Sequence, residues 1–322
     1  WEKEVSMNIG MEAIIKNDFE IALDFFKKDR FDILAEPESE IPQFYGMNLP
    51  DLNVGEVSNK GFEAMIRYNN ISENDLNFYV ETNIWYAKNE IKYQSESIQL
   101  FDYLYRTGHP VDQPFMLESI GFFESQEDIN SSPVQPQSII QPGDLKYKDQ
   151  NNDNIIDIND YVAMGKTSVP ELTAGLITGL KYKNFDLELF IQGVTGRSVY
   201  LSGKYFQAFQ NNGKISTIAL GRWTETEETP PTYPRLSESN NLNNFQYSSF
   251  WLRNGSFIKL RSLEIGYNFS RTLINKINIE MARLFINGTN LFSLDHMEFT
   301  DPEIMTGYPP MRKYSLGIKI QF

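Results

Sequence analysis

Apolar side chains alternate with polar or small ones over the last ten residues of the chain, at positions 313–322. The apolar members of this stretch are Tyr314, Leu316, Ile318, Ile320 and Phe322. Because successive side chains of a β-strand point to opposite faces, the pattern predicts a strand with one apolar face and one small or polar face. On its own, this strand would also fit the sheet of a soluble sandwich.

The same alternation recurs from the beginning of the chain. Residues 5–15 and 19–25 alternate on either side of Asn17-Asp18, which predicts a hairpin with a short turn. Six further alternating stretches lie at residues 61–69, 76–88, 173–182, 185–193, 256–269 and 280–292. The pattern therefore predicts an all-β fold of about nine antiparallel strands.

The connections between these strands alternate in length. Short turns are expected near residues 17, 73, 183 and 274, whereas long loops are expected at about residues 30–60, 89–171, 194–255 and 293–312. Outer-membrane β-barrels have short periplasmic turns, long extracellular loops and strands whose apolar faces meet lipid. We therefore predict a transmembrane β-barrel of the outer-membrane type, with its lumen lined by Asp24, Glu63, Arg67, Glu81, Asp186, Glu188, Lys319 and Gln321.

Composition and charge narrow the possible functions. The net charge of -14 argues against a nucleic-acid partner, because few cations are left to neutralise phosphates. The chain has no cysteine, so disulfides and thiolate metal sites are excluded. No apolar run is long enough for a transmembrane helix. The chain starts at Trp1 without a basic or apolar leader, so we expect any targeting segment to lie upstream or to have been removed.

One stretch in the long loop at 89–171 has the residues of a metal site. In the sequence DQNNDNIIDIND, at residues 149–160, side-chain oxygens fall at positions 1, 3, 5, 9 and 12, the spacing of an EF-hand-type calcium loop. We predict that calcium is bound by the carbonyl of Ile155 and by the side chains of Asp149, Asn151, Asp153, Asp157 and Asp160. Asn154 replaces the usual glycine, and Asp160 replaces a longer glutamate, which should weaken binding. The alternative is a solvated turn whose side chains bond their own backbone.

No residue pattern indicates an enzyme. His109 and His296 lie in different predicted loops without the spacing of a metal or acid–base site, and no nucleophile elbow marks a hydrolase. Aromatic residues in the loops could stack on sugar rings or pack the loops onto one another. These residues are Phe101, Tyr103, Tyr105, Phe122, Phe123, Tyr205 and Phe206.

Several stretches resemble, in family order, the C-terminal part of SusC/RagA-type TonB-dependent outer-membrane transporters of Bacteroidetes. They are NVGEVSNKGFE at residues 53–63, RTGHP at 106–110, QPGDLKYKD at 141–149, FWLRNGSFIKL at 250–260, NGTNLF at 287–292, DPE at 301–303 and the closing strand. The resemblance implies energised import of a bulky nutrient, an oligosaccharide or a peptide, across the bacterial outer membrane. It also implies a SusD-type surface lipoprotein as a lid. The alternating residues that end at Phe322 would be the signal read by the barrel-assembly machinery.

The chain lacks counterparts of the family's plug, its energy-coupling segment and its first strands. Residues 1–322 are therefore expected to be the C-terminal segment of the barrel, which closes against about thirteen strands from an upstream segment or another chain. The TonB complex would act through the missing N-terminal part. With an odd number of strands, Trp1 would lie at the extracellular rim and Phe322 in the periplasm, and the first and last strands should not pair with each other.

Two other classes of protein remain as alternatives. One is an outer-membrane enzyme, which would need a cluster of titratable residues at the extracellular rim that the sequence does not reveal. A secreted, calcium-binding β-rich adhesin or carbohydrate-binding protein would also combine alternating strands with an acidic loop. Such a protein would dissolve without detergent, whereas a barrel segment with a lipid-facing surface would not.

Overall fold

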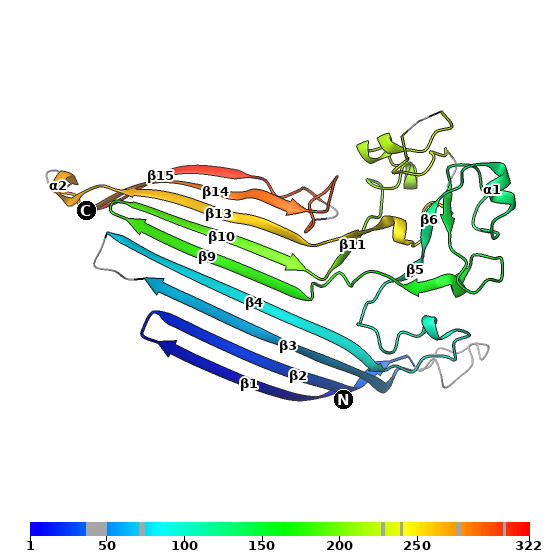
Figure 1. Ribbon diagram of the computed structural model, residues 1–322, viewed down its shortest axis with the longest axis horizontal. Coiled ribbons are helices and arrows are strands. Elements are labelled where there is room, and N and C mark those ends of the chain that lie inside the picture. Colours follow the sequence, from blue (N-terminus) through cyan, green and yellow to red (C-terminus); the bar gives the residue numbers. More distant parts are fainter. Residues whose placement is uncertain (37–49, 71–74, 227–228, 239–240, 275–277, 305–306) are drawn as a thin grey trace.

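The computed structural model describes residues 1–36, 50–70, 75–226, 229–238, 241–274, 278–304 and 307–322. Nine strands form one antiparallel sheet in the order β1-β2-β3-β4-β9-β10-β13-β14-β15 (Figure 1). Their bounds are β1 Lys3–Ile15, β2 Phe19–Ala35, β3 Leu52–Asn70, β4 Leu76–Tyr93, β9 Leu172–Tyr182, β10 Phe185–Thr195, β13 Phe257–Asn268, β14 Met281–Asp295 and β15 Lys313–Gln321. The predicted all-β fold and its nine long strands are confirmed.

Short turns lie at one end of this sheet and long connections at the other, as Figure 1 shows. The first turn uses left-handed backbone at Lys16 and Asn17, with φ of 53° and 59°, and the β9–β10 turn does so at Lys183, with φ of 53°. Such positive φ values match the twist of tight hairpins. The predicted turns near residues 73 and 274 extend into 71–74 and 275–277, which lie outside the described residues. The one-sided distribution of long loops is confirmed.

The strands on the N-terminal side of the sheet are longer than predicted. β2, β3 and β4 contain 17, 19 and 18 residues, so the loops predicted at 30–60 and 89–171 begin later than expected. The apolar alternation of β2 stops after Phe25, but the backbone ladder continues with charged residues, such as Arg30, whose guanidinium lies 3.1 Å from Glu4. Backbone pairing does not require apolar side chains, so the alternation underestimates strand length. Residues 37–49 of the first long loop lie outside the described part of the chain.

One face of the sheet is apolar and exposed. The register places Leu187 of β10 between Leu180 of β9 and Ile265 of β13. At the edges, Ile9 is 65% exposed and Leu316 is 75% exposed. Large apolar side chains in a row over many strands are unusual on a surface that faces water.

The opposite face carries the charged residues that were predicted to share it. Arg67 of β3 lies 4.0 Å from Glu81 of β4, and Arg283 of β14 lies 2.7 Å from Glu264 of β13. Arg283 also pairs with Asp186 of β10. The two-residue period of the strands therefore sends most apolar and most charged side chains to opposite faces, with exceptions such as Phe190, which shares the face of Glu188, and Lys27, which shares the face of Phe25.

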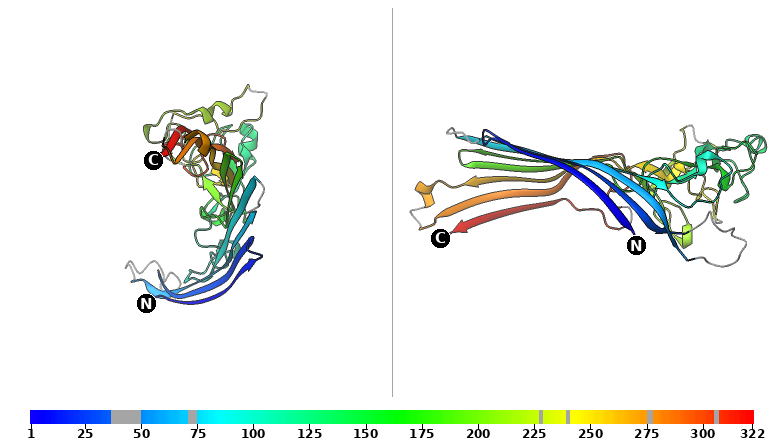
Figure 2. Two further views of the ribbon diagram at one scale, coloured as in Figure 1. Left: turned by 90° about the vertical axis from the view of Figure 1, so that its left-hand side faces the viewer. Right: turned by 90° about the horizontal axis from the view of Figure 1, so that it is seen from below.

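The sheet is curved and open. Its edge strands, β1 and β15, lie at opposite ends of the sheet order and do not pair with each other (Figure 2). This confirms the expectation that the first and last strands do not close a small barrel. Each edge presents unpaired backbone groups, which a sheet normally covers or pairs.

The long connections contain short elements of their own. Three two-stranded sheets pair β5 Phe115–Leu117 with β8 Tyr161–Ala163, β6 Ser119–Phe122 with β7 Leu145–Tyr147, and β11 Ser198–Tyr200 with β12 Leu252–Asn254. The helices are α1 Gln126–Asn130, α2 Arg271–Ile274, η2 Asp102–Leu104, η3 Ile158–Asp160, η4 Gln210–Asn212, η5 Thr217–Gly221 and η6 Ser249–Trp251. None of the helices in the described ranges is long and apolar enough to cross a membrane.

Candidate functional site in the long loops

Two long loops, at residues 94–171 and 196–256, meet around a buried carboxylate. Asp144 has no solvent exposure, and its Oδ1 lies 2.7 Å from Nε of Arg235. The side-chain amides of Asn241 and Asn244 donate to the same oxygen at 2.8 and 2.9 Å. These three partners all come from the second loop. We call Asp144, Arg235, Asn241 and Asn244 the Asp144 hub. A buried carboxylate with a cation and two amide donors is well compensated.

A second layer of buried polar contacts extends the hub. Gln135 donates to the carbonyl of Leu145 at 2.9 Å and accepts from the Tyr147 amide at 2.8 Å. The Tyr147 hydroxyl donates to the carbonyl of Asn243 at 2.6 Å, and burial raises the pKa of this phenol. These bonds join β7, which lies within the QPGDLKYKD stretch, to Gln135 of the first loop and to Asn243 of the second.

An aromatic cluster lies beside the hub. Trp251 is fully buried and donates from Nε1 to the carbonyl of Asn244 at 2.9 Å. Its ring packs edge-on against Tyr233 and Phe250, with centroids 5.7 and 4.9 Å away. Phe206, Leu201 and Ile218 complete the buried cluster. The FWLRNG stretch therefore anchors the second loop by apolar packing.

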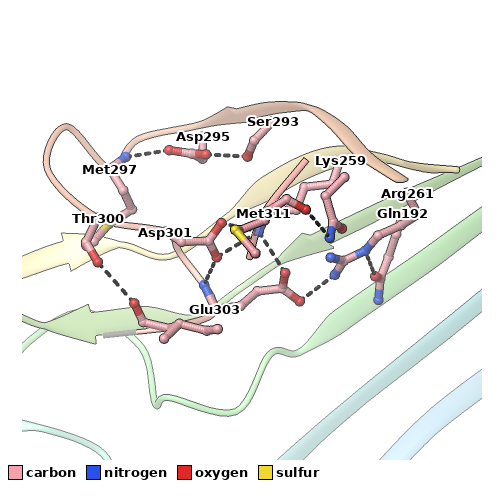
Figure 3. Close-up of polar contacts among 12 residues, drawn as sticks. Gln192, Lys259, Arg261, Ser293, Asp295, Met297, Thr300, Asp301, Glu303 and Met311 are labelled. Atoms are coloured by element: carbon pink, nitrogen blue, oxygen red, sulfur yellow. Dashed lines mark hydrogen bonds and ion pairs between the residues drawn. The ribbon is translucent and has the colours of Figure 1, made fainter. Parts of the chain in front are cut away.

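The DPE stretch fixes the connection between β14 and β15 to the sheet (Figure 3). Nζ of Lys259, a β13 residue only 3% exposed, lies 2.7 Å from Oδ2 of Asp301 and 2.7 Å from Oε2 of Glu303. Arg261 also pairs with Glu303 and donates from Nε to Gln192 at 2.7 Å. We call Lys259, Arg261, Asp301 and Glu303 the DPE anchor.

The charges of the anchor are mutually compensating. Burial alone would raise the pKa of Glu303, but its hydrogen bonds to Arg261 and Lys259 outweigh this effect and lower it. The carboxylate is therefore held in its charged form, and the loop is fixed to the sheet by two cations and two anions.

A cavity of about 90 Å³ lies between the aromatic cluster and the β14–β15 connection. Its floor includes the buried Trp251 and Tyr233, and its rim includes His296, Glu298 and Phe299. Arg253 also lines it, from the short strand β12. This cavity has a mixed lining, and pockets that combine apolar walls with a few polar groups are usual ligand sites.

The predicted calcium residues all lie in one compact loop. Asp149 accepts from the amides of Asn152 and Asn154 at 2.6 and 2.8 Å, and Asp160 accepts from those of Gln150 and Asp157 at 2.7 and 2.9 Å. Asn151 accepts from Asp153, Asp153 from Ile155, and Asp157 from Asn159. Asn154 has the left-handed backbone, with φ of 67°, that this position requires.

Tyr103 lies beside this loop. The Tyr103 hydroxyl donates to the carbonyl of Asn159 at 2.7 Å, and its pKa is raised by burial and then by the negative charges of Asp160, Asp149, Asp153 and Asp157. Burial also raises the pKa of Asp160. The donor types fit a hard cation, but in the described ranges no three acidic or histidine side chains gather at one point as a metal site requires.

The other predicted residues occupy simpler environments. The side chains of Tyr314, Leu316, Ile318, Ile320 and Phe322 are all exposed, and the first four lie on β15, the edge strand. His109 packs edge-on against Phe115 at 5.2 Å, and His296 lines the cavity. Sequence reasoning missed Asp144, Lys259 and Arg253 as individual residues, although each lies in or beside a stretch that had been singled out.

The chain is similar over its full length to TonB-dependent receptors. No known protein-family model matches it. It is 26% identical to TonB-dependent receptor P26 of Formosa agariphila and 21% identical to TonB-dependent receptor SusC of Bacteroides thetaiotaomicron, covering 35% and 32% of these proteins. Its fold matches the RagAB peptide transporter with a TM-score of 0.73 and 22% identity, covering 100% of this chain and 36% of that one. The chain thus spans about a third of the length of the relatives it matches.

Proposed function

We propose that this chain, whose homologues are TonB-dependent receptors including SusC, forms C-terminal strands of an outer-membrane barrel that imports a bulky nutrient. The observation that carries the proposal is the full-length similarity to these receptors, joined to an open nine-stranded sheet with an exposed apolar face. In a barrel, that face meets lipid and the charged face lines the lumen. The same exposed face argues against the alternative of a secreted adhesin or carbohydrate-binding protein.

The proposal includes the partners of such a barrel. The edges of β1 and β15 would pair with the remaining strands, because unpaired backbone groups in lipid cost several kcal/mol each. A plug and a TonB-coupling segment would come with those strands. The loop assembly would face the cell exterior and contact a SusD-type lipoprotein lid, and the function would be transport without catalysis. The cargo would be an oligosaccharide or a peptide.

Uptake by cells tests import directly. The gene would be deleted from its host, and accumulation of fluorescently labelled oligopeptides and oligosaccharides compared between deletion and parent strains. We expect one of the two pools to enter parent cells only, and a protonophore to abolish its entry, because TonB-dependent transport requires energy. Equal accumulation of both pools in the two strains would reject the proposal.

Arginine substitutions on the two faces of β10 test the membrane position of the sheet. Leu187→Arg places a charge on the apolar face and should cost about 2 to 4 kcal/mol of folding free energy near the bilayer midplane. Glu188→Arg, one residue along, changes the charged face and should be tolerated. Folding in lipid vesicles, followed by urea titration, measures both values. Equal losses would contradict the assignment of the two faces.

Single cysteines test the orientation of the sheet. Asn130, exposed at the end of α1, should be extracellular when replaced by cysteine, and Asn17, in the β1–β2 turn, should be periplasmic. A membrane-impermeant maleimide applied to intact cells should label Asn130→Cys alone. Labelling of Asn17→Cys alone would show the opposite orientation. Labelling of both after permeabilisation serves as the control.

Calcium binding by the loop at 149–160 remains part of the proposal, supported by its donor types and their order along the chain. Because Tyr103 lies beside the four carboxylates, it should sensitise terbium luminescence from a bound ion. We expect calcium to displace terbium, and Asp157→Asn to weaken binding about tenfold or more, since affinity depends on ligand charge. The matched control is Asp128→Asn, outside the loop. Equal affinity in both variants would rule out the predicted site.

A further inference from the structure

Arg253 holds a partly desolvated charge without a carboxylate partner. Its Nη1 donates to the carbonyls of Phe250 and Leu252 at 2.6 and 3.0 Å. Within the described residues, no acidic side chain forms a salt bridge with it. Burial lowers the pKa of this guanidinium, and the charge of Glu298 only partly offsets the effect. A desolvated cation is costly unless an anion pairs with it.

Arg253 lines the cavity. Since Nη1 is held by two backbone carbonyls, the guanidinium has a fixed orientation, and among the described residues its Nε and Nη2 make no hydrogen bond and remain for a ligand. Those two donors form the fork that binds a carboxylate through two parallel hydrogen bonds. Phe250, whose ring centroid lies 5.9 Å from the guanidinium, stabilises its charge and forms part of the wall.

The rest of the cavity sets the size and shape of the ligand. A volume of about 90 Å³ corresponds to about three waters, enough for a carboxylate and a few carbons but not for a long chain. The aromatic floor, including Trp251, would cover the apolar body of that group. Among the described residues, the His296 imidazole makes no hydrogen bond, so it can contact a second ligand oxygen. Glu298 is exposed at the rim, where solvent screens its repulsion.

We propose that this cavity, built by Arg253, His296 and the aromatic cluster, binds the carboxylate-bearing end of the imported molecule. The inference rests on the proposed import function and names the chemistry of the cargo. A carboxylate of this kind is found at the C-terminus of a peptide and on an acidic sugar. The cavity lies between the second loop and the β14–β15 connection, so a bound ligand would contact both.

Two pairs of ligands on the intact protein in detergent test this inference by calorimetry. One pair is an N-acetylated apolar tripeptide as free acid and as amide, and the other is a trigalacturonide as free acid and as methyl ester. In at least one pair, we expect the acid to bind about ten- to hundredfold more tightly than its neutral counterpart. The responding pair identifies the source of the carboxylate.

Two variants then test whether the preference for the free acid arises in the cavity. Arg253→Gln should abolish it, whereas Arg312→Gln, at an exposed arginine of the β14–β15 connection, should retain it. Absence of acid preference in both pairs, or its persistence in Arg253→Gln, would overturn the inference. The ligand comparison on the unaltered protein tests the inference even if a variant fails to fold. Equilibrium binding needs no energy from TonB. If the protein prefers the free acid but deletion and parent strains accumulate both labelled pools equally, import is rejected and carboxylate binding is not.

Discussion

Asp144→Ala is expected to destabilise the loop assembly by about 3 to 5 kcal/mol, the usual cost of breaking a buried ion pair. The substitution removes the carboxylate that Arg235, Asn241 and Asn244 share, and leaves a cation and two amides without their acceptor in a buried site. The two long loops would then separate locally while the sheet remains, because the hub contains no residue of the nine long strands.

Native-state hydrogen exchange measures this loss where it occurs. The amides of Leu145 and Tyr147 donate to Asn244 and Gln135 and should exchange about a hundredfold faster or more. Glu118→Ala is the matched control, because Glu118 pairs with Lys148 at 3.0 Å on a partly exposed surface. It should cost about 1 kcal/mol or less. Unchanged protection in Asp144→Ala would show that the hub does not hold the loops together.

The sheet could be predicted from sequence because its signal is local. Alternation across residues such as Phe185, Leu187 and Leu189 identifies a strand, and each strand pairs with the next along the chain, so order follows directly. The ends of β2 and β3 could not be placed, since the ladder there continues through Lys27, Lys28 and Arg30 without apolar alternation. Two strands stay paired for as long as both continue side by side, and only the three-dimensional structure shows where that pairing ends.

The Asp144 hub and the DPE anchor consist of contacts between residues that are far apart in the sequence. For that reason the sequence indicated the stretches that form them but not which side chains meet. Asp144 and Asn244 are 100 positions apart, and Lys259 and Asp301 are 42 apart. The stretches QPGD and DPE stood out only through their resemblance to a family. Their roles, as a hub and an anchor, follow from which cation or amide each carboxylate meets. The candidate calcium loop at residues 149–160 stood out because its donors are close in sequence.

The second large effect is expected at the DPE anchor. Lys259→Met removes a charge that is almost fully buried and leaves Asp301 and Glu303 facing each other with Arg261 as the remaining cation. We expect the β14–β15 connection to loosen by about 3 kcal/mol, because Asp301 and Glu303, whose side chains are 16% and 29% exposed, lose the buried cation that they share. Hydrogen exchange of residues 296–304 should report this change, and Lys313→Met, at an exposed lysine, should leave it unaltered.

Low pH should weaken the DPE anchor, because Glu303 then loses its charge. Its pKa is lowered in the folded protein, so its contribution is complete above the ordinary glutamate range and is lost as the pH falls through the lowered pKa. In Lys259→Met one cause of that lowering is gone, so the folded-state pKa should be higher and the loss should be complete at a higher pH. The same exchange measurement, repeated across the acidic range, compares the two midpoints. Identical midpoints would mean that Lys259 does not hold Glu303 in its charged form. Since His296, Glu298 and Phe299 lie on the connection that the anchor fixes, a loosened anchor should also weaken carboxylate binding in the cavity beside Arg253.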